Sequence, residues 1–436
     1  MRYVYIHTLG CRLNQAESDA MLQRLYELGY EIADKSSPAD LCIIHTCAVT
    51  HEAEAKCRKV IRHTIQRNPN AEIVVIGCYV EKDIEVLKKI EGIDLIVDNK
   101  RKLDWFSHIK GTKRDTPEIL TGSDWKLTSL ECFTNTKPIS IPSFHRANIK
   151  IQEGCNSFCS YCIIPYLRGP SRSRPADAIL REIAWRIEAG TKEIVLTGIN
   201  IGNYKDDGKN LISLLDMISN EFGNNLRVRL SSIELNSLNI DILTRMKNPN
   251  YPLVPYLHIP LQSGSNTILK RMNRPYSREN YRDYVLLAIE TVPDIGISAD
   301  VLTGFPGETL SLFNETLTFL EELPIYFLHI FPYSPREGTP AWSFPDNIAP
   351  NEIEHRVHQL IDLSQKKRKI FYEKAIGTVR EVLFEEKEGG YWQGYTDNYI
   401  RVMADFHESL ENKLCKVKLE HIDHNGMEGS ITSIIK

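Results

Sequence analysis

The sequence predicts an α/β fold in three parts: an N-terminal parallel α/β domain, a central partial (β/α)6 barrel and a C-terminal small all-β barrel. Three observations favour this prediction. Strand and helix patterns alternate over residues 1–100, a second alternating series of six units starts near residue 148, and short alternating runs fill the chain beyond Gly377. The expected boundaries are 1–130, 143–372 and 373–436, which agrees with about three domains for a chain of this length.

The first part has the pattern of successive βα units. The expected strands are Tyr3–Thr8, Leu41–His45, Ile73–Gly77 and Ile93–Val97, and the expected helices are Asn14–Leu28 and His51–Arg67. Gly29 and Asn68-Pro69 are typical helix stops. Because strands and helices alternate, we expect a parallel sheet. Residues 101–145 show little periodicity and are expected to be a connection.

The second series predicts a full or partial barrel. Its expected strands are Asn148–Gln152, Glu193–Thr197, Leu226–Leu230, Val254–Ile259, Gly296–Leu302 and Phe327–Phe331. Helical patterns such as Pro175–Ala189 and Leu310–Leu323 separate them, and Glu352–Ala375 is expected to be one charged helix. The later short runs are Val379–Phe384, Tyr391–Tyr395, Tyr399–Val402, Leu414–Leu419 and Gly429–Ile435, which are typical of a small β-barrel.

The composition is that of a globular protein without membrane segments. Apolar residues make up 42% and charged residues 25%, and no apolar run reaches the ~18 residues of a membrane span. The N-terminus lacks the apolar core of a signal peptide, so we expect a cytoplasmic protein. The net charge of −4 neither indicates nor excludes a nucleic-acid partner. Ten cysteines are too few for a disulfide framework, and in a reducing compartment clustered cysteines favour metal binding or catalysis.

Three of these cysteines lie on one short loop. Cys155, Cys159 and Cys162 have the spacing C-x3-C-x2-C and directly follow an expected strand. Three thiolates can hold three irons of a 4Fe-4S cluster, which leaves the fourth iron open to a substrate. The alternative is a zinc or coincidental loop, but structural zinc normally takes four ligands in two separated pairs, and no second C-x2-C pair exists in the sequence.

Three other cysteines each follow an expected strand of the first part: Cys11, Cys47 and Cys78. If those strands are neighbours in a parallel sheet, their carboxyl ends bring the three thiols to one edge, again with three ligands. The alternative is three small buried core residues. Cys42, Cys57, Cys132 and Cys415 are assigned no role.

Together these features resemble the radical S-adenosylmethionine methylthiotransferase family over the whole chain. The first part is similar to its auxiliary-cluster domain, the middle to its radical domain and the tail to its TRAM domain, a small RNA-binding barrel. The run Thr8-Leu9-Gly10-Cys11-Arg12-Leu13-Asn14-Gln15-Ala16-Glu17-Ser18 is most similar to the branch that acts on threonylcarbamoyladenosine in tRNA. The isopentenyladenosine branch usually has Cys-Gln-Met-Asn here, and the ribosomal-protein branch usually has Cys-Pro-Lys-Asn.

The resemblance implies methylthiolation of carbon 2 of the adenosine beside the anticodon, with two 4Fe-4S clusters and two molecules of S-adenosylmethionine. The cluster held by Cys155, Cys159 and Cys162 would cleave the first molecule to a radical that removes hydrogen from carbon 2. The second molecule would methylate a sulfur at a cluster held by Cys11, Cys47 and Cys78. Implied contacts to S-adenosylmethionine are Gly198, Asn200, Ser232, Glu234, Gln262 and Asp300, each of which could also be a turn or capping residue.

The expected partners are the anticodon loop of tRNA and a reductase or flavodoxin-type electron donor, and we expect a monomer. Candidate phosphate contacts are Arg168, Arg172 and Arg174, and also the stretch Lys56–Arg67, which has five Lys or Arg and no acid but could be a solvated helix face. Residues 373–436 carry eight Lys or Arg against twelve Asp or Glu, which argues against an RNA grip by charge alone. There, Tyr391, Trp392, Tyr395 and Tyr399 could stack on bases or fill the barrel. An alternative is that this domain reads the bulky threonyl adduct, in which case alanine at Trp392 and Tyr399 is expected to impair tRNA modification without unfolding the tail.

Two kinds of alternative stay open. An enzyme of the same chemistry could act on isopentenyladenosine in tRNA or on an aspartate of a ribosomal protein. A protein of another class, an RNA-binding iron–sulfur redox sensor, would hold clusters without catalysis. Cleavage of S-adenosylmethionine by the reduced protein separates the sensor from the enzymes.

Overall fold

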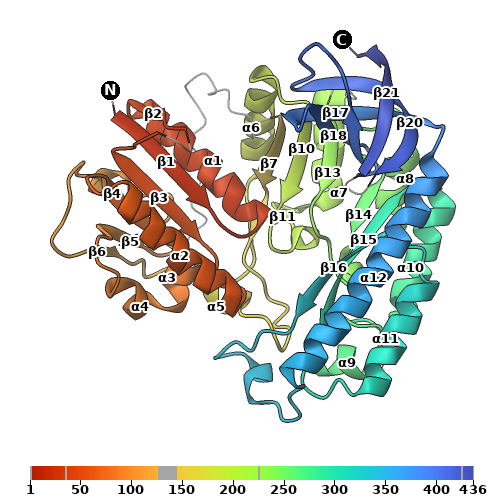
Figure 1. Cartoon of the computed structure of the whole chain (residues 1–436), viewed down its shortest axis with the longest axis horizontal. Coiled ribbons are helices and arrows are strands. Elements are labelled where there is room, and N and C mark those ends of the chain that lie inside the picture. The colour runs from red at the N-terminus through yellow and green to blue at the C-terminus, as the bar shows by residue number, and fades with distance from the viewer. Residues whose placement is uncertain (1, 35–36, 126–144, 224–225, 424–425, 436) are drawn as a thin grey trace.

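A computed structural model describes residues 2–34, 37–125, 145–223, 226–423 and 426–435. A parallel sheet with its helices lies beside a partial barrel, and a closed β-barrel formed by the C-terminal residues packs against one end of that barrel (Figure 1). This arrangement confirms the predicted fold class. None of the described helices is long and apolar enough to cross a bilayer.

The N-terminal sheet has six parallel strands in the order β2-β1-β3-β4-β5-β6. Their bounds are β1 Arg2–Thr8, β2 Tyr30–Ile32, β3 Leu41–Thr46, β4 Glu72–Gly77, β5 Leu95–Val97 and β6 Glu118–Leu120, with helices α1 Arg12–Glu27, α2 His51–Arg67, α3 Cys78–Lys82 and α4 Ile84–Lys88. The expectation that residues 101–145 form only a connection is wrong for their first half, because β6 extends the sheet. Residues 126–144, with Cys132, lie outside the described part.

The order reverses between β1 and β3, which are neighbours although β2 follows β1 in sequence. In open parallel sheets, ligands bind beyond the carboxyl ends of the strands at such a switch point. The residues that follow β1, β3 and β4 therefore occupy the edge where the fold favours a site.

The barrel consists of six parallel strands in two three-stranded sheets, as the sequence predicts. Their bounds are β7 Arg146–Lys150, β10 Glu193–Thr197, β13 Arg227–Leu230, β14 Tyr256–His258, β15 Gly296–Thr303 and β16 Phe327–Pro332. A bridge between Val228 and Leu253 joins the two sheets. Helices α5 Ile164–Arg168, α6 Ala176–Glu188, α7 Leu211–Phe222, α8 Ile240–Lys247, α9 Asn266–Arg271, α10 Arg278–Thr291 and α11 Leu310–Glu322 connect the strands. The unit has one large apolar core and two smaller apolar clusters.

A long helix, α12 (Pro350–Ala375), leads from the barrel into the tail. The tail forms a closed barrel in the order β17-β18-β19-β21-β20. The bounds are β17 Val379–Glu388, β18 Tyr391–Thr396, β19 Arg401–Ala404, β20 Lys413–Asp423 and β21 Gly426–Ile434. Its separate apolar core includes Trp392, Val402 and Val417.

Candidate active site

Cys11, Cys47 and Cys78, here called the strand-end cysteines, follow three adjacent strands. Cys11 follows β1 and Cys47 follows β3, while Cys78 begins α3 directly after β4. Cys47 interacts electrostatically with both Cys11 and Cys78, and burial together with these neighbours raises the pKa of Cys47 to about 12. The topology therefore brings together three thiols that are far apart in sequence.

Two glycines allow the turns that bear these cysteines to approach one another. Gly10 has φ +98°, and a Cβ there would lie 2.9 Å from the Cβ of Cys47. Gly77 has φ +104°, and a Cβ there would lie 2.6 Å from the Thr46 carbonyl oxygen. Both positions require a left-handed backbone and have no room for a side chain, so glycine fits them where other residues would be strained.

Cys57, to which the sequence assigned no role, supports Cys47. The Cys47 amide donates to the Cys57 Sγ at 3.3 Å, and the Cys57 thiol donates back to the Cys47 carbonyl at 3.3 Å. Asn14 adds a second support, since its amide group donates to the Leu9 carbonyl (2.7 Å) and the Thr46 carbonyl (3.1 Å). The Asn14 hydrogen bonds therefore link the turns after β1 and β3, and the Cys57 hydrogen bonds hold the turn after β3 against α2.

Cys155, Cys159 and Cys162, here called the loop cysteines, lie on the turn between β7 and α5. Gly154 has φ +73°, and a Cβ there would lie 2.0 Å from the Pro170 carbonyl oxygen. The Cys155 amide donates to the Gly169 carbonyl at 3.1 Å, which closes the loop on itself. This contact explains why glycine precedes the first loop cysteine.

A buried arginine is directed at the loop cysteines. Arg274 donates to the Cys159 Sγ at 3.1 Å, and it also forms an ion pair with Glu234 and a hydrogen bond to the Tyr276 hydroxyl. Burial raises the pKa of Cys159, and the Arg274 guanidinium partly offsets this by favouring the thiolate, which is the form that binds metal. Glu234, expected to contact S-adenosylmethionine, is the carboxylate that pairs with Arg274 in this structure.

The donor sets fit iron–sulfur clusters. All six cysteines are free thiols, as are the other cysteines of the described chain. Burial raises the pKa of Cys162 to about 12, so this thiol stays protonated until a metal displaces the proton. Among the described residues, no group of three or more His, Cys, Asp or Glu side chains is placed to hold a single metal ion.

A buried group of charges, here called the interface charge cluster, lies between the part that bears the strand-end cysteines and the part that bears the loop cysteines. It comprises Glu17 and Lys102 of the N-terminal part with Lys150, Glu153 and Arg168 of the barrel. Lys150 lies 2.7 Å from Glu17 and 2.6 Å from Glu153, and Arg168 lies 2.9 Å from Glu153. Burial alone would raise the pKa of Glu17, but Lys102, Lys150 and Arg168 hold it well below its usual range. Arg168 also hydrogen-bonds Asn14, one turn beyond Cys11.

This arrangement corrects the expectation that Arg168 and Arg174 contact tRNA phosphates. Arg168 is 0% exposed and belongs to the interface charge cluster. Arg174 is buried and forms an ion pair with Glu182 at 2.6 Å. Arg172 is partly exposed, but its guanidinium donates to the Pro170 and Arg168 carbonyls. All three arginines therefore organise the loop beside the loop cysteines.

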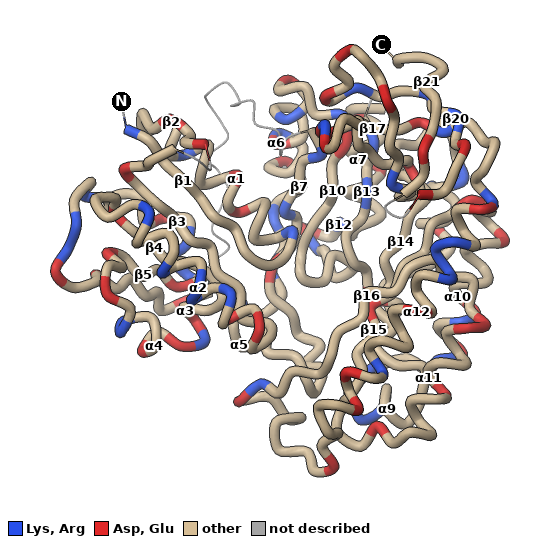
Figure 2. The backbone as a smooth tube through the Cα atoms, in the orientation of Figure 1, with Lys and Arg blue, Asp and Glu red and all other residues tan. Residues whose placement is uncertain are grey.

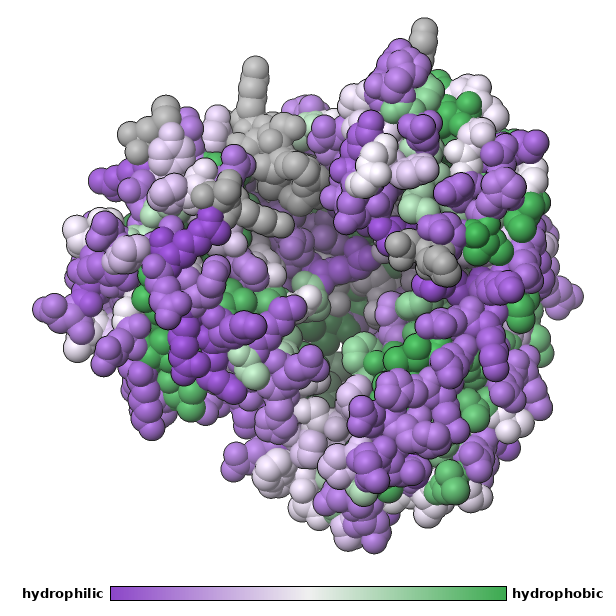
Figure 3. All heavy atoms as spheres, viewed as in Figure 1, coloured by the Kyte–Doolittle hydropathy of each residue, from purple (hydrophilic) through white to green (hydrophobic). Residues whose placement is uncertain are grey.

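The expected S-adenosylmethionine contacts divide between two cavities. Gly198 and Ser232 line a cavity of about 460 Å³, here called the central pocket, which Cys11 also lines. Gln262 and Asp300 line a cavity of about 220 Å³ beside Cys162, here called the loop pocket. Asn200 lines neither; it is buried, and its side-chain oxygen has no hydrogen-bond partner in the described chain. Figure 3 shows the hollow that lies between the N-terminal sheet and the barrel.

The sequence reasoning missed two histidines in the central pocket. His258 donates to or accepts from Ser298 at 3.0 Å and lies 2.9 Å from a carboxylate oxygen of Asp300. His329 packs against His258 with ring centroids 4.9 Å apart, and burial lowers the pKa of His329 to about 4. Both residues lie within apolar strand runs, where a single histidine gives little signal.

Two of the tail aromatics lie in different surroundings, and Trp392 follows the expected alternative of filling the barrel. Trp392 is 8% exposed and belongs to the core of the tail barrel, so its replacement would disturb folding and not RNA stacking alone. Tyr399 lines the central pocket, where its ring stacks on Tyr256 with centroids 4.6 Å apart. The tail thus contributes a side chain to the same cavity as Cys11.

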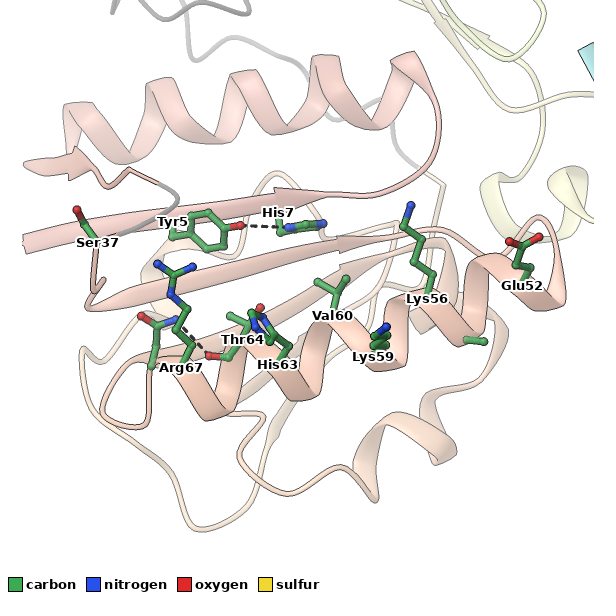
Figure 4. Close-up of a pocket in the computed structure, with 12 residues that line it drawn as sticks. Tyr5, His7, Ser37, Glu52, Lys56, Lys59, Val60, His63, Thr64 and Arg67 are labelled. Atoms are coloured by element: carbon green, nitrogen blue, oxygen red, sulfur yellow. Dashed lines mark hydrogen bonds between the residues drawn. The ribbon is translucent and has the colours of Figure 1, made fainter. Parts of the chain in front are cut away.

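A further cavity of about 680 Å³, here called the β1–α2 groove, lies outside this site (Figure 4). Tyr5 and His7 of β1 form one wall, hydrogen-bonded to each other at 3.1 Å. Lys56, Lys59, His63 and Arg67 of α2 form the opposite wall, together with Glu52 at the start of the helix. Figure 2 shows Lys and Arg positions along α2.

Comparison with known proteins identifies the family. Residues 3–98 match the family described as "Uncharacterized protein family UPF0004", and residues 149–320 match the radical SAM superfamily. Threonylcarbamoyladenosine tRNA methylthiotransferase MtaB of Bacillus subtilis is 36% identical over 446 residues, covering 100% of this chain and 98% of that protein. A tRNA-2-methylthio-N(6)-dimethylallyladenosine synthase of Thermodesulfovibrio yellowstonii is 32% identical, covering 99% of each chain.

The radical S-adenosylmethionine methyltransferase TsrM of Kitasatospora setae, solved with cobalamin and a [4Fe-4S] cluster, superimposes with a TM-score of 0.57 at 14% identity. It covers 78% of this chain and 74% of its own, and at that identity it shows the fold alone. From the full-length sequence matches, the chain belongs to the radical S-adenosylmethionine methylthiotransferase family, is an enzyme of that family, and is most similar to its threonylcarbamoyladenosine branch.

Proposed function

We propose that this enzyme attaches a methylthio group to carbon 2 of N6-threonylcarbamoyladenosine, next to the anticodon of tRNA, using two molecules of S-adenosylmethionine and two 4Fe-4S clusters. The observation that carries the proposal is the central pocket. Cys11 from the N-terminal sheet, Gly198 and Ser232 from the barrel, and Tyr399 from the tail line one cavity. At about 460 Å³ it has the size of a small-molecule or nucleoside site.

The six cysteines divide into two ligand sets in this proposal. The loop cysteines would hold the cluster that binds S-adenosylmethionine, and the strand-end cysteines would hold the auxiliary cluster. When bound, these groups supply the one-electron chemistry and the sulfur that protein side chains cannot provide. We propose that residues 1–130 form the unit with the auxiliary cluster, residues 143–372 the radical unit, and residues 373–436 the RNA-binding unit.

The protein's own residues would position the reactants and exclude water. A Cβ at Gly198 would lie 2.9 Å from the Gln152 carbonyl oxygen, so glycine lets the turn after β10 pack closely against Gln152. Gln152 fixes that turn, since its side-chain oxygen accepts from the amides of Ile199 (3.0 Å) and Asn200 (2.9 Å). We assign Gly198, Asn200, Ser232, Glu234, Gln262 and Asp300 to S-adenosylmethionine binding. Glu234 would also hold Arg274 against Cys159.

The β1–α2 groove would bind the tRNA backbone. Lys56, Lys59, Arg62, His63 and Arg67 are exposed on α2, and none of them forms an ion pair within the described part of the chain. The 17-residue helix spans about 25 Å, enough for several phosphates. A row of unpaired cations along an accessible groove is the electrostatic arrangement that RNA phosphates require.

We further propose a cytoplasmic monomer that receives electrons from a reductase or flavodoxin-type donor. The electron donor follows from the one-electron chemistry of the reaction, and the compartment follows from its tRNA substrate.

The test is an anaerobic turnover with S-adenosylmethionine, a reductant, a sulfur source and tRNA bearing threonylcarbamoyladenosine, followed by mass spectrometry of the nucleosides. A methylthio gain on that nucleoside is the expected result. A gain only on isopentenyladenosine or on a ribosomal protein would overturn the substrate. Failure of the reduced protein to cleave S-adenosylmethionine would favour the redox sensor.

A further inference from the structure

Arg12 lines the central pocket and has no ion-pair partner among the described residues. It begins α1 directly after Cys11, and its side chain is partly exposed. Its guanidinium donates to the Tyr399 hydroxyl at 2.6 Å, and no carboxylate of the described chain forms an ion pair with it. Because a guanidinium carries five N–H donors, most of its hydrogen-bonding capacity remains available in the cavity.

The other charges around this cavity are already matched. Arg229 forms an ion pair with Glu193 through distances of 2.7 and 3.2 Å, and His258 lies against Asp300. Among the described residues that line the pocket, none is Asp or Glu, whereas Arg12, Arg229, His258 and His329 line it. A cavity with one unpaired permanent cation and no acid favours an anionic ligand.

The aromatic surroundings hold Arg12 in place. Tyr399 has φ +73°, a backbone conformation that residues other than glycine seldom adopt, so its contacts must impose it. Its ring stacks on Tyr256 and lies 5.0 Å from Tyr395, and the Arg229 guanidinium lies 4.6 Å from its centroid. The hydroxyl that anchors Arg12 is therefore fixed by both the barrel and the tail.

We propose that Arg12, anchored by Tyr399, is a carboxylate-binding subsite that selects an adenosine whose N6 substituent ends in a carboxylate. This inference rests on the proposed function, because the threonylcarbamoyl group carries that carboxylate. A planar guanidinium binds a carboxylate through paired hydrogen bonds. An isopentenyl group has no charge and would leave Arg12 desolvated and unpaired, which disfavours it.

The first test is binding, because it does not depend on the clusters. We would measure the affinity of the chain for tRNA with and without the threonylcarbamoyl group, for the wild type, Arg12→Gln and Arg12→Lys. The wild type should prefer the modified tRNA by on the order of 10- to 100-fold. Arg12→Gln should lose this preference and Arg12→Lys should keep part of it. Arg24→Gln, at a partly exposed position of the same helix where the arginine pairs with Glu27, is the control.

The second test compares tRNA carrying the threonylcarbamoyl group with tRNA carrying its methyl ester. With the wild-type enzyme, the ester should raise KM and change kcat little, as expected for lost binding. With Arg12→Gln the acid and the ester should perform alike. Tyr399→Phe, which keeps the stacked ring, should give a smaller loss of the same kind. If Arg12→Gln weakens both substrates equally, the inference is wrong; if the wild type modifies neither, the proposed function itself fails.

Discussion

The two cysteine sets differ in how the chain assembles them. The loop cysteines occupy eight consecutive residues, so their proximity is a property of one turn. The strand-end cysteines span 68 residues and meet only because β1, β3 and β4 are neighbours in the sheet. The first set is specified by local spacing and the second by topology. The first site therefore depends on contacts within one turn, and the second depends on contacts between strands.

Their electrostatic surroundings differ as well. Cys159 receives a hydrogen bond from buried Arg274, whereas Cys47 exchanges hydrogen bonds with the neutral thiol of Cys57. The interface charge cluster lies between the sets, with Arg168 close enough to Cys78 and Cys11 that both raise its pKa. The loop cysteines therefore have a cation of their own, Arg274. The strand-end cysteines lie near Arg168, which also belongs to the interface charge cluster.

Removing one thiol from each set should separate two activities. Cys155→Ala is expected to reduce both cleavage of S-adenosylmethionine and methylthio transfer to background, because the loop cysteines bind the molecule that is cleaved. Cys11→Ala should keep cleavage and lose transfer. Deoxyadenosine release and nucleoside mass spectrometry measure the two steps. Cys42→Ala, in the core of β3, is the matched control. Methylthio transfer by either Cys155→Ala or Cys11→Ala would contradict the proposed division of roles between the two cysteine sets.

Breaking the interface charge cluster should destabilise the protein. Arg168→Gln leaves Glu17 and Glu153 with one cation fewer in a fully buried site, which is expected to lower the free energy of unfolding by on the order of 3 kcal/mol. Urea denaturation followed by circular dichroism measures the change. Arg181→Gln, on the exposed face of α6, should leave the midpoint unchanged. Equal midpoints for the two variants would show that the cluster does not hold the parts together.

Removing the cation beside the loop cysteines should change the midpoint potential of one cluster only. Arg274→Gln takes a positive charge and an N–H donor from Cys159, so the midpoint potential of that cluster should become more negative by tens of millivolts. A redox titration monitored by electron paramagnetic resonance measures it. The signal of the other cluster should stay in place, as should both signals in Arg271→Gln. A shift in the strand-end cluster alone would reverse the assignment.

The smallest effect is expected in the β1–α2 groove. Lys56→Glu with Lys59→Glu should weaken tRNA binding about 10-fold at low salt and reduce the slope of log affinity against log salt by about 1.5, as for two lost phosphate contacts. Lys366→Glu with Lys369→Glu has the same spacing on exposed positions of α12 and serves as the control. An unchanged slope for the first pair would place the tRNA elsewhere.

Much of the fold could be predicted from the sequence because apolar periodicity reports burial. The expected strands at residues 193–197 and the helix at 51–67 agree with the structure residue for residue. Strands β2 and β6 were missed because each has three residues and little apolar pattern. Periodicity over such short runs is too weak to separate a strand from a loop.

The site was predictable where the signal is local. The loop cysteines follow from spacing, but the role of Arg168 and Arg174 was wrong because their partners Glu17, Glu153 and Glu182 lie elsewhere in the chain. The same limit applies to Arg12, which looks like an ordinary surface cation until Tyr399, 387 residues away, is seen to hold it. The sequence shows that a residue is charged, but its ion-pair and hydrogen-bond partners depend on the fold.

The central claim is that two independent cysteine sets each hold a cluster, and iron content tests it most directly. The wild type, a variant with the three loop cysteines replaced by alanine, and a variant with the three strand-end cysteines replaced would be reconstituted anaerobically and analysed for iron and sulfide. We expect about eight irons in the wild type and about four in each variant. A wild type with about four irons, or a strand-end variant that keeps about eight, would contradict the account.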